Sequence, residues 1–454
     1  MPMIDLISAL STVVWLAAAA GLAVVTVAAV VLLGLALVAA GQCLVGALTA
    51  ERCRLPSRPP GRVAILVPAH DEEAGIAATV VDLRRQLRPG DRLLVVADNC
   101  ADRTAAVARA AGAEVIERQD PRRRGKGHAL ARGVEVLAAD PPEVVVIVDA
   151  DCRLSPGAAL TLAGHAASTG RPIQADYVLS PADPSARSAT SALAFLVRNR
   201  VRPRALAALG LPCQLTGSGM AFPWALVAHG PLGGAHLVED LLVGVELGLR
   251  GRPPLACVRA HVSSRLADRS DPAAAATQRT RWEHGHLVVL RTHGPRLLRE
   301  AMRQRRLDLL AQALDLAVPP LSLLTLLLLA TAGAAAVAGW TLPLALAAAG
   351  LGALALGLGA AWCRFGREVL PARRAILGVP GYVLWKLPIY ATYALRGAER
   401  RWVRTRRGPA ETLIVTAAED AEGGPHRDGA PRSVDAASAR PRAEPSPLTP
   451  AGGA

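Results

Sequence analysis

The stretch Val144-Val145-Val146-Ile147-Val148-Asp149-Ala150-Asp151-Cys152 decides the fold of this chain. Five β-branched residues in a row predict a strand buried on both faces, as in the interior of a parallel sheet. The strand ends in two carboxylates, at the edge where open α/β sheets bind their ligands. Asp149 and Asp151 offer hard oxygen ligands that suit Mg²⁺ or Mn²⁺ shared with a substrate's phosphates. An isolated Asp-x-Asp is more often a solvated turn, so the rest of the chain must decide between the two interpretations.

The composition indicates a membrane protein with one globular domain. Of the 454 residues, 52% are hydrophobic, and the apolar residues are concentrated towards the two ends. The net charge is +14, and only Lys126 and Lys386 among the 51 basic residues are lysines. The arginines cluster beside the apolar segments, which favours the cytoplasmic face of a membrane over nucleic acid as a partner. Seven scattered cysteines without a Cys-x-x-Cys pair argue for reduced thiols.

The apolar segments predict several membrane helices. Residues 6–49 are nearly free of charge, and we expect one long helix centred within residues 18–44, preceded by an interfacial piece at residues 4–16. Arginines follow this segment, so the positive-inside rule places the next domain in the cytoplasm. Residues 314–337 and 342–362 predict a transmembrane hairpin. Residues 375–395 contain two prolines and a lysine, which favours an interfacial or re-entrant segment.

Strands alternate with helices in the polar middle of the chain. The pattern predicts strands over residues 62–68, 93–97, 113–117 and 144–148, with helices over 72–87, 104–111 and 126–138. This alternation is typical of an α/β fold with a mostly parallel sheet. No Gly-x-Gly-x-x-Gly follows the first strand, which leaves a dinucleotide-binding dehydrogenase with little support. The expected organisation is a transmembrane region (1–54), a cytoplasmic catalytic domain (55–310), a transmembrane hairpin (311–365), an interfacial or re-entrant segment (366–410) and a disordered tail (411–454).

Six short motifs in a fixed order carry a resemblance. They are Val-Pro-Ala-His-Asp-Glu-Glu at 67–73, Ala-Asp-Asn-Cys at 97–100, Gly-Lys-Gly-His at 125–128, Asp-Ala-Asp at 149–151, Val-Glu-Asp at 238–240 and Gln-Arg-Thr-Arg-Trp at 278–282. With these motifs, residues 62 to about 290 resemble the family 2 glycosyltransferases, the membrane-bound group that includes cellulose, chitin, hyaluronan and poly-N-acetylglucosamine synthases. The resemblance implies a nucleotide-sugar-binding domain of the GT-A type, flanked by transmembrane helices.

The resemblance also implies a role for each motif. The residues expected to bind the nucleotide-sugar donor are Pro68, Ala69, Glu72, Asp98, Lys126, Asp149, Gln278 and Arg281. Asp149 and Asp151 would hold Mg²⁺ or Mn²⁺ as the cofactor. The chain departs from the family's common forms at Asp71 and at Asn99-Cys100, where the detailed donor contacts are therefore open. Asp98 could equally be a helix cap, and Lys126 outside this context would be an exposed loop residue.

The acceptor side follows from the later motifs. By resemblance Asp240 is the general base and Glu239 its neighbour, although an acidic pair also suits a helix N-terminus. Gly217 and Ser218 match a small-residue turn beside the acceptor, and Trp282 would stack on an acceptor sugar.

Three functions remain open at this point. The first is an inverting glycosyltransferase on the cytoplasmic side of the plasma (inner) membrane, acting on a growing polysaccharide or its precursor, with export partner subunits as possible additions. The second adds a single sugar to a lipid-linked acceptor. The third is a membrane protein that binds nucleotide sugar without turnover. Nothing in the sequence names the sugar, the linkage or the oligomeric state, and no motif supports nucleic-acid binding.

Overall fold

The computed structural model describes residues 2–50, 56–181, 185–228, 239–265, 272–367, 369 and 372–397. By its internal contacts the chain divides into the units Met1–Thr412 and Leu413–Ala454. All described helices and strands belong to the first unit. The second unit, and with it most of the expected disordered tail, lies outside the described residues.

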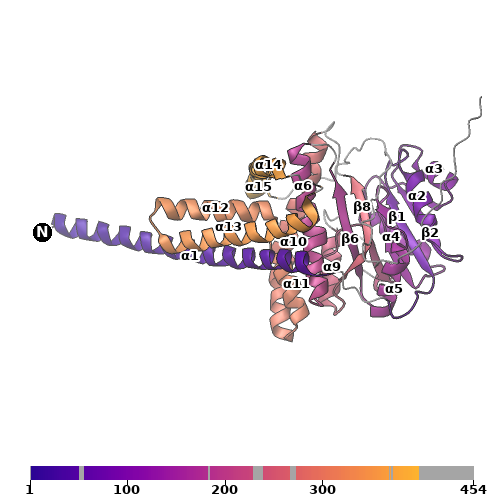
Figure 1. The fold of residues 1–454 in the computed structure, drawn as a ribbon, viewed down its shortest axis with the longest axis horizontal. Coiled ribbons are helices and arrows are strands. Elements are labelled where there is room, and N and C mark those ends of the chain that lie inside the picture. The colour runs from indigo at the N-terminus through magenta and orange to yellow at the C-terminus, as the bar shows by residue number, and fades with distance from the viewer. Residues whose placement is uncertain are drawn as a thin grey trace, which may run out of the picture. The chain divides into compact units, whose positions relative to one another are not determined.

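An eight-stranded mixed sheet carries the α/β part, with the strand order β3-β2-β1-β4-β7-β6-β8-β5 (Figure 1). The strands β3, β2, β1 and β4 run parallel, and β7 joins β4 in the antiparallel direction. The strands are β1 Val63–Ala69, β2 Arg92–Asp98, β3 Glu114–Arg118, β4 Val144–Ile147, β5 Arg153–Leu154, β6 Ile173–Ser180, β7 Met220–Pro223 and β8 Leu255–Arg265. The four strands expected from the sequence are all present, and their sheet is parallel as predicted.

Helices cover both faces of the sheet. Those of the α/β part are α2 Ile76–Arg84, α3 Thr104–Ala110, α4 Lys126–Leu137, α5 Ala158–Thr169, α6 Ala186–Leu196, the π-helix η1 Val197–Val201, α7 Arg202–Ala208, α8 Trp224–Val227 and α9 Glu239–Leu249. Alternate residues of β1 pack into two different clusters: Ile65 packs with the residues of α2 and α5, whereas Leu66 packs with those of α4. The central strands are therefore buried on both faces, as their unbroken apolar runs require.

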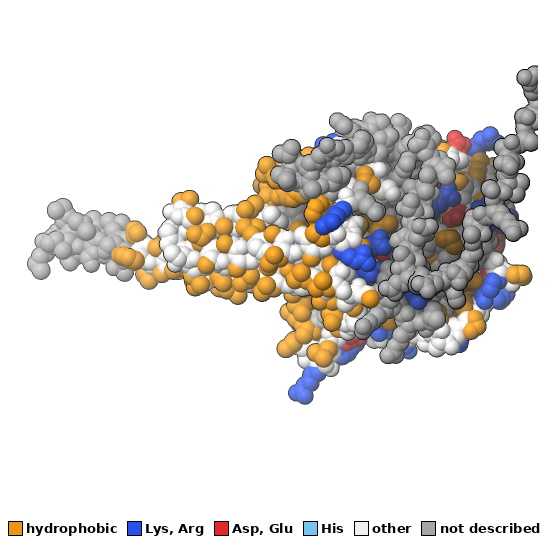
Figure 2. Space-filling model, viewed as in Figure 1, with side chains coloured by type: hydrophobic (Ala, Val, Ile, Leu, Met, Phe, Trp, Pro, Cys, Tyr) orange, Lys and Arg blue, Asp and Glu red, His pale blue; other side chains and the backbone are white. Residues whose placement is uncertain are grey.

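Three long apolar helices form a second part. They are α1 Pro2–Leu48, α12 Leu321–Val337 and α13 Thr341–Ala361, which continues into the π-helix η2 Trp362–Gly366. Figure 2 shows hydrophobic side chains along these helices, with lysine and arginine side chains gathered where they meet the α/β part. Within the described residues, α1 from Val14 and α13 with η2 are long and apolar enough to cross a membrane, and α11 with α12 would make a third span if counted as one.

Two expectations about these helices need correction. No break separates an interfacial piece from the N-terminal span, because α1 continues without interruption from Pro2 to Leu48. The segment expected as one span over residues 314–337 is two helices, α11 Leu307–Ala317 and α12, bent by 70°. Pro319 and Pro320 explain the bend, since proline provides no backbone N–H and disfavours helix at the residue before it.

Three further helices connect the two parts. The helix α10 Pro272–Gln304 carries the last sequence motif, and α14 Ala372–Trp385 and α15 Leu387–Arg396 follow the apolar hairpin. These last two helices meet at Lys386, inside the segment expected to be interfacial or re-entrant. The backbone of α14 lies beside α6, because a Cβ atom on Gly378 would come within 2.9 Å of Ala186.

Candidate active site

Most of the predicted donor residues lie at or near the carboxyl edge of the parallel strands, whereas Gln278 and Arg281 belong to α10. Ala69 at the end of β1 is in register with Ala97 of β2, and Leu66 of β1 is in register with Ile147 of β4. Asp149 follows β4 after one residue, Val148, so its carboxylate lies at the edge where α/β sheets bind ligands.

Lys126 and Asp149 form an ion pair at this edge. The Nζ atom of Lys126 lies 2.5 Å from Oδ1 of Asp149 and donates a hydrogen bond to the carbonyl oxygen of Gly217, also at 2.5 Å. The two side chains are 22% and 28% exposed, so both are open to a ligand. Lys126 begins α4, and its ammonium group is therefore placed by a helix start rather than by a flexible loop.

Asp149 and Asp151 fit a divalent cation. One ligand atom of each carboxylate and the Sγ atom of Cys152 all lie within 4.8 Å of one another. Asp151 is oriented by Ser264, whose hydroxyl donates to Oδ2 at 2.9 Å. Burial raises the pKa of Cys152 to about 12, so its thiol stays protonated and is a poor metal ligand. The two carboxylates remain, and hard oxygen ligands are those that Mg²⁺ and Mn²⁺ prefer.

The predicted nucleotide-binding residues are held by hydrogen bonds to neighbouring residues. Asp98 is buried and accepts a hydrogen bond at 2.5 Å from Arg118. The backbone N–H of Glu72 donates to the hydroxyl of Thr104 at 2.7 Å. Asp71, where the family pattern is not followed, adopts a left-handed φ of 51° and accepts at 2.6 Å from the backbone N–H of Ala101. The loops after β1 and β2 are thus tied to each other, with Pro68 and Ala69 at their base.

Asp240 lies beside Gly217 in the wall of the cavity. A Cβ atom on Gly217 would lie 3.3 Å from Oδ2 of Asp240 and 3.8 Å from Nζ of Lys126. Burial raises the pKa of the Asp240 carboxyl group, while the charges of Lys126 and Arg198 oppose that shift. A carboxyl group whose pKa is raised is a stronger base than an ordinary aspartate. Asp240 stands in the first turn of α9, as its sequence predicts, and the side chain of Glu239 lies outside the described residues.

Ser218 has a structural role in place of the expected acceptor contact. Its side chain is fully buried, and its Oγ atom accepts a hydrogen bond from the backbone N–H of Asp149 at 3.1 Å. Gly217 beside it has a φ of 95°, a backbone conformation that L side chains rarely adopt. The turn therefore places Gly217 on the cavity wall and keeps Ser218 behind it.

The last motif reaches the same cavity from α10. Gln278, Arg281 and Trp282 all line it, as their spacing on one helix face predicts. The Nε atom of Arg281 is buried without a hydrogen-bond partner in the described part of the chain. Trp282 packs against the ring of Phe195 at 5.7 Å, and the guanidinium group of Arg279 lies 5.7 Å from its ring centroid. Part of the Trp282 ring is therefore already in contact with the protein.

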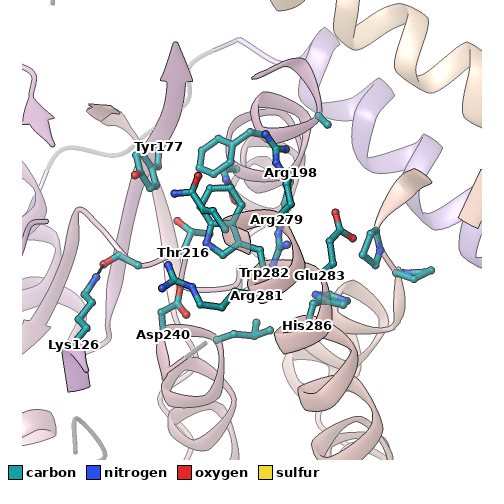
Figure 3. Close-up of a pocket in the computed structure, with 18 of the residues that line it drawn as sticks. Lys126, Tyr177, Arg198, Thr216, Asp240, Arg279, Arg281, Trp282, Glu283 and His286 are labelled. Atoms are coloured by element: carbon teal, nitrogen blue, oxygen red, sulfur yellow. Dashed lines mark hydrogen bonds between the residues drawn. The ribbon is translucent and has the colours of Figure 1, made fainter. Parts of the chain in front are cut away.

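The cavity has a volume of about 480 Å³. In the view of Figure 3, Asp240 lies between Lys126 on one side and His286 of α10 on the other. The cavity is lined by the pair Lys126–Asp149 and also by Pro319, at the break before α12, and Ser322, in the first turn of α12. Of the predicted site residues, those lining the cavity are Lys126, Asp149, Gly217, Asp240, Gln278, Arg281 and Trp282.

Several residues of this cavity are not evident from the sequence. They are Arg198 of η1, Arg279, Glu283 and His286 of α10, and Lys386. The only available signal is helical spacing, since His286 lies four residues after Trp282 and therefore on the same face of α10. Lys386 is one of only two lysines in the sequence, but this does not predict that it lines the cavity.

Comparisons with known proteins give a family and a similar fold. The model of the glycosyltransferase like family 2 matches residues 59–285, half of the chain. The mannosyltransferase PcManGT of Pyrobaculum calidifontis, solved with GDP-Man and Mn²⁺, is 19% identical, with a TM-score of 0.50 over 81% of this chain and 99% of that one. The glucosyl-3-phosphoglycerate synthase of Mycobacterium tuberculosis is 20% identical, with a TM-score of 0.32 over 50% of this chain and 80% of that one. No curated protein sequence matches the chain.

The family match, together with the GT-A-like sheet, defines a glycosyl-transferring enzyme. The chain belongs to the glycosyltransferase like family 2, and the protein is a glycosyltransferase.

Proposed function

We propose that this protein is an inverting glycosyltransferase that moves a sugar from a nucleotide-diphosphate sugar to an acceptor at the cytoplasmic face of the plasma membrane. The observation that carries the proposal is a single cavity that joins Lys126 and Asp149 to Asp240 and to Arg281. One cavity thus contains candidate residues for binding the donor diphosphate (Lys126 and Asp149), a candidate base (Asp240) and an arginine that can bind an anion (Arg281). This combination suits the transfer of a sugar from a nucleotide diphosphate.

Inversion at the anomeric carbon is supported by the number of carboxylates in the cavity that are not in an ion pair. Among the described residues that line the cavity, the acidic ones are Asp149, Asp240 and Glu283. Asp149 is paired with Lys126, and Glu283 is paired with Lys386. Asp240 is thus the one carboxylate of these without an ion pair, which suits a single displacement with one base. Asp240 would take the proton of the acceptor hydroxyl as its oxygen attacks the anomeric carbon and the diphosphate leaves.

The leaving diphosphate would be stabilised from the opposite side of the cavity. Asp149 and Asp151 would hold a Mg²⁺ or Mn²⁺ ion, which supplies charge neutralisation for the diphosphate. Lys126 and Arg281 provide further positive charge, and the unpartnered Nε atom of Arg281 suits a phosphate oxygen. The P. calidifontis enzyme was solved with a nucleotide-diphosphate sugar and Mn²⁺, which agrees with this donor class.

The acceptor would be a growing polysaccharide or its precursor, by resemblance to the synthase group. A single transfer to a lipid-linked acceptor is the second candidate. The reach of the cavity to Ser322, at the start of the candidate membrane helix α12, favours this alternative.

Release of the nucleotide tests the proposal directly. The purified full-length protein in detergent with Mn²⁺ should release UDP or GDP from one of UDP-glucose, UDP-N-acetylglucosamine, UDP-galactose and GDP-mannose. Asp240→Asn should abolish the release and still bind the nucleotide. A ladder of product sizes would identify elongation, and one glycolipid would identify single transfer. Donor binding by the wild type without turnover on any acceptor would instead support a non-catalytic binding protein.

A further inference from the structure

The cavity also contains a group of polar side chains on η1 and α10 that have no role in the proposed donor site. We call Arg198, Asn199 and His286 the basic subsite. Arg198 and Asn199 belong to the π-helix η1, and His286 belongs to α10, so the subsite joins two elements far apart in the sequence. All three side chains line the cavity. A π-helix inserted between α6 and α7 is itself a feature that is frequent at functional sites.

Two members of the basic subsite have buried polar atoms without a well-formed hydrogen bond. His286 is 5% exposed, and neither ring nitrogen makes a hydrogen bond of good geometry within the described part of the chain, although the backbone of Leu316 and Val318 lies close to the ring. Asn199 is 3% exposed, and its Oδ1 atom has no partner there. An unsatisfied buried polar group costs about 1–3 kcal/mol, and native proteins keep few of them. Side chains of this kind facing a cavity indicate that a ligand completes their hydrogen bonds.

The charge of the subsite selects the kind of ligand. No carboxylate of the described residues forms an ion pair with Arg198, and its nearest charged influences are Arg202, Asp240 and Asp315. Arg202 is already bound to Asp315 at 2.7 Å and to Gln42 at 2.6 Å. Burial and the two arginines lower the pKa of His286 to about 3, against the opposing effect of the nearby backbone of Leu316 and Val318, so the ring is neutral and carries one N–H. A guanidinium group with a neutral N–H donor suits an anion with several oxygens.

The position of the subsite indicates where this anion comes from. Gln42, which holds Arg202, lies in the last turns of the candidate membrane helix α1. The cavity wall next to the subsite is formed by Val318 to Ser322, where α11 bends into α12. Charged groups at the ends of membrane helices are level with lipid head groups. The ligand therefore carries its anionic group at the membrane interface.

We propose that Arg198 and His286 bind the phosphoryl group of a lipid acceptor, whose free hydroxyl then faces Asp240. This assignment rests on the proposed glycosyl transfer and names the acceptor class as a phosphate-bearing lipid. Arg198 sits near enough to Asp240 for each charge to affect the other, so a phosphate held there keeps the attached head group beside the base.

Binding without turnover tests this assignment independently of the reaction. Dodecyl phosphate is titrated into the full-length protein in a neutral detergent, with inorganic phosphate and dodecanol as the comparison ligands. Arg198→Gln should weaken binding of dodecyl phosphate by roughly tenfold or more, because it removes a charged hydrogen-bond donor. His286→Gln, which can still donate, should weaken it less than His286→Ala. Arg132→Gln, on the exposed face of α4, should leave it unchanged.

Three results would overturn the assignment. The first is that Arg198→Gln melts at the wild-type temperature and binds dodecyl phosphate as tightly as the wild type does. The second is an equal loss of UDP binding in that variant, which would assign Arg198 to the donor. The third is equal affinity for inorganic phosphate and dodecyl phosphate, which would indicate a soluble ligand. Loss of phosphate-lipid binding in a protein that never releases UDP or GDP would support the subsite and count against the proposed reaction.

Discussion

The Nζ atom of Lys126 lies 2.5 Å from Oδ1 of Asp149, between the first residue of one helix and the end of the central strand. The same ammonium group holds the carbonyl oxygen of Gly217, so one lysine joins the metal motif to the turn beside Asp240. Without substrate, Lys126 neutralises a carboxylate that the proposed reaction needs for a divalent cation. The lysine and the cation therefore compete for Asp149 until the diphosphate gives the ammonium group another partner.

Lys126→Gln should change metal and nucleotide affinity in opposite directions. Removing the ammonium group makes the empty site more negative, so the affinity for Mn²⁺ alone should rise by about fivefold, the equivalent of ~1 kcal/mol for a partly exposed ion pair. The affinity for UDP in the presence of Mn²⁺ should fall, because a phosphate partner is lost. Calorimetric titration with Mn²⁺, and with UDP in the presence of Mn²⁺, measures whether each affinity rises or falls. A fall in both affinities would contradict the competition, and Arg132→Gln serves as the surface control.

The raised pKa of Asp240 should appear in the pH–rate profile. A base acts only when deprotonated, so kcat/KM should rise with pH through a midpoint above the ordinary aspartate value of 3.8. Asp240→Asn should remove this limb and lower kcat by about 10²–10⁴-fold. Arg198 lowers the pKa of Asp240, so Arg198→Gln should move the midpoint to higher pH. An unchanged midpoint in Arg198→Gln would show that the charge of Arg198 does not affect the pKa of Asp240.

Asp240→Asn should also test the cost of burying this carboxylate. A pKa raised by folding means that the folded state binds the proton more tightly than the unfolded state. The stabilising contribution is therefore present at low pH and is lost as the pH rises through the folded value. At neutral pH the asparagine variant should melt at a temperature equal to or above that of the wild type. A clearly lower melting temperature would indicate that the charged form of Asp240 stabilises the fold.

The local parts of the site could be predicted from the sequence. The apolar run before Asp149 determines the strand, and the strand determines the edge at which the carboxylate stands. Gln278, Arg281 and Trp282 share a face because helical periodicity requires it. These predictions hold because each depends on residues close together in the chain.

The contacts between distant segments could not be predicted. Arg198 and His286 are 88 residues apart in the chain, and only the tertiary fold brings η1 and α10 to one cavity. Ser218 illustrates the converse. Its motif suggested an acceptor contact, but the left-handed φ of Gly217 turns the glycine to the wall and buries the serine. Single-residue turns of this kind decide which side chain meets the ligand, and a sequence does not reveal them.

The two glycines around Ser218 should behave differently when a methyl group is added. Gly219→Ala would place Cβ 2.3 Å from Val262 Cγ2 and 2.8 Å from the Cβ of Ala175, at a φ of 66°. Overpacking and backbone strain together should lower stability by about 3 kcal/mol. Gly217→Ala meets only Asp240 and Lys126, so it should cost about 1–2 kcal/mol and lower kcat by roughly tenfold or more.

Gly210→Ala provides the matched control for these variants. Gly210 has a φ of 68° and nothing within 4 Å of an added Cβ, so it reports the backbone cost alone, about 1–2 kcal/mol without loss of activity. Thermal unfolding and kcat are measured for all three variants. Equal losses of stability in Gly219→Ala and Gly210→Ala would show that Val262 moves aside freely.

A buried ion pair joins α10 to the junction of α14 and α15. Glu283 of α10 pairs with Lys386 and accepts a hydrogen bond from the hydroxyl of Tyr390 at 3.0 Å. Glu283 is 8% exposed and Lys386 is 3% exposed. Glu283 directly follows Trp282 in the chain, so the pair holds the backbone beside that ring against the junction of α14 and α15. Removing one partner leaves an uncompensated buried charge, whereas removing both does not.

Glu283→Met alone should therefore lower the free energy of unfolding by about 3–5 kcal/mol, and so should Lys386→Met. The double variant should recover most of this loss, because two methionines of similar length fill the same space without charge. A double-mutant cycle, with unfolding followed in detergent, measures the coupling. If the pair also positions Trp282, kcat should fall in each single variant. It should stay low in the double variant, because the methionines restore the packing but not the hydrogen bond to Tyr390. Additive losses of stability would contradict the ion pair, and full recovery of kcat in the double variant would limit its role to folding.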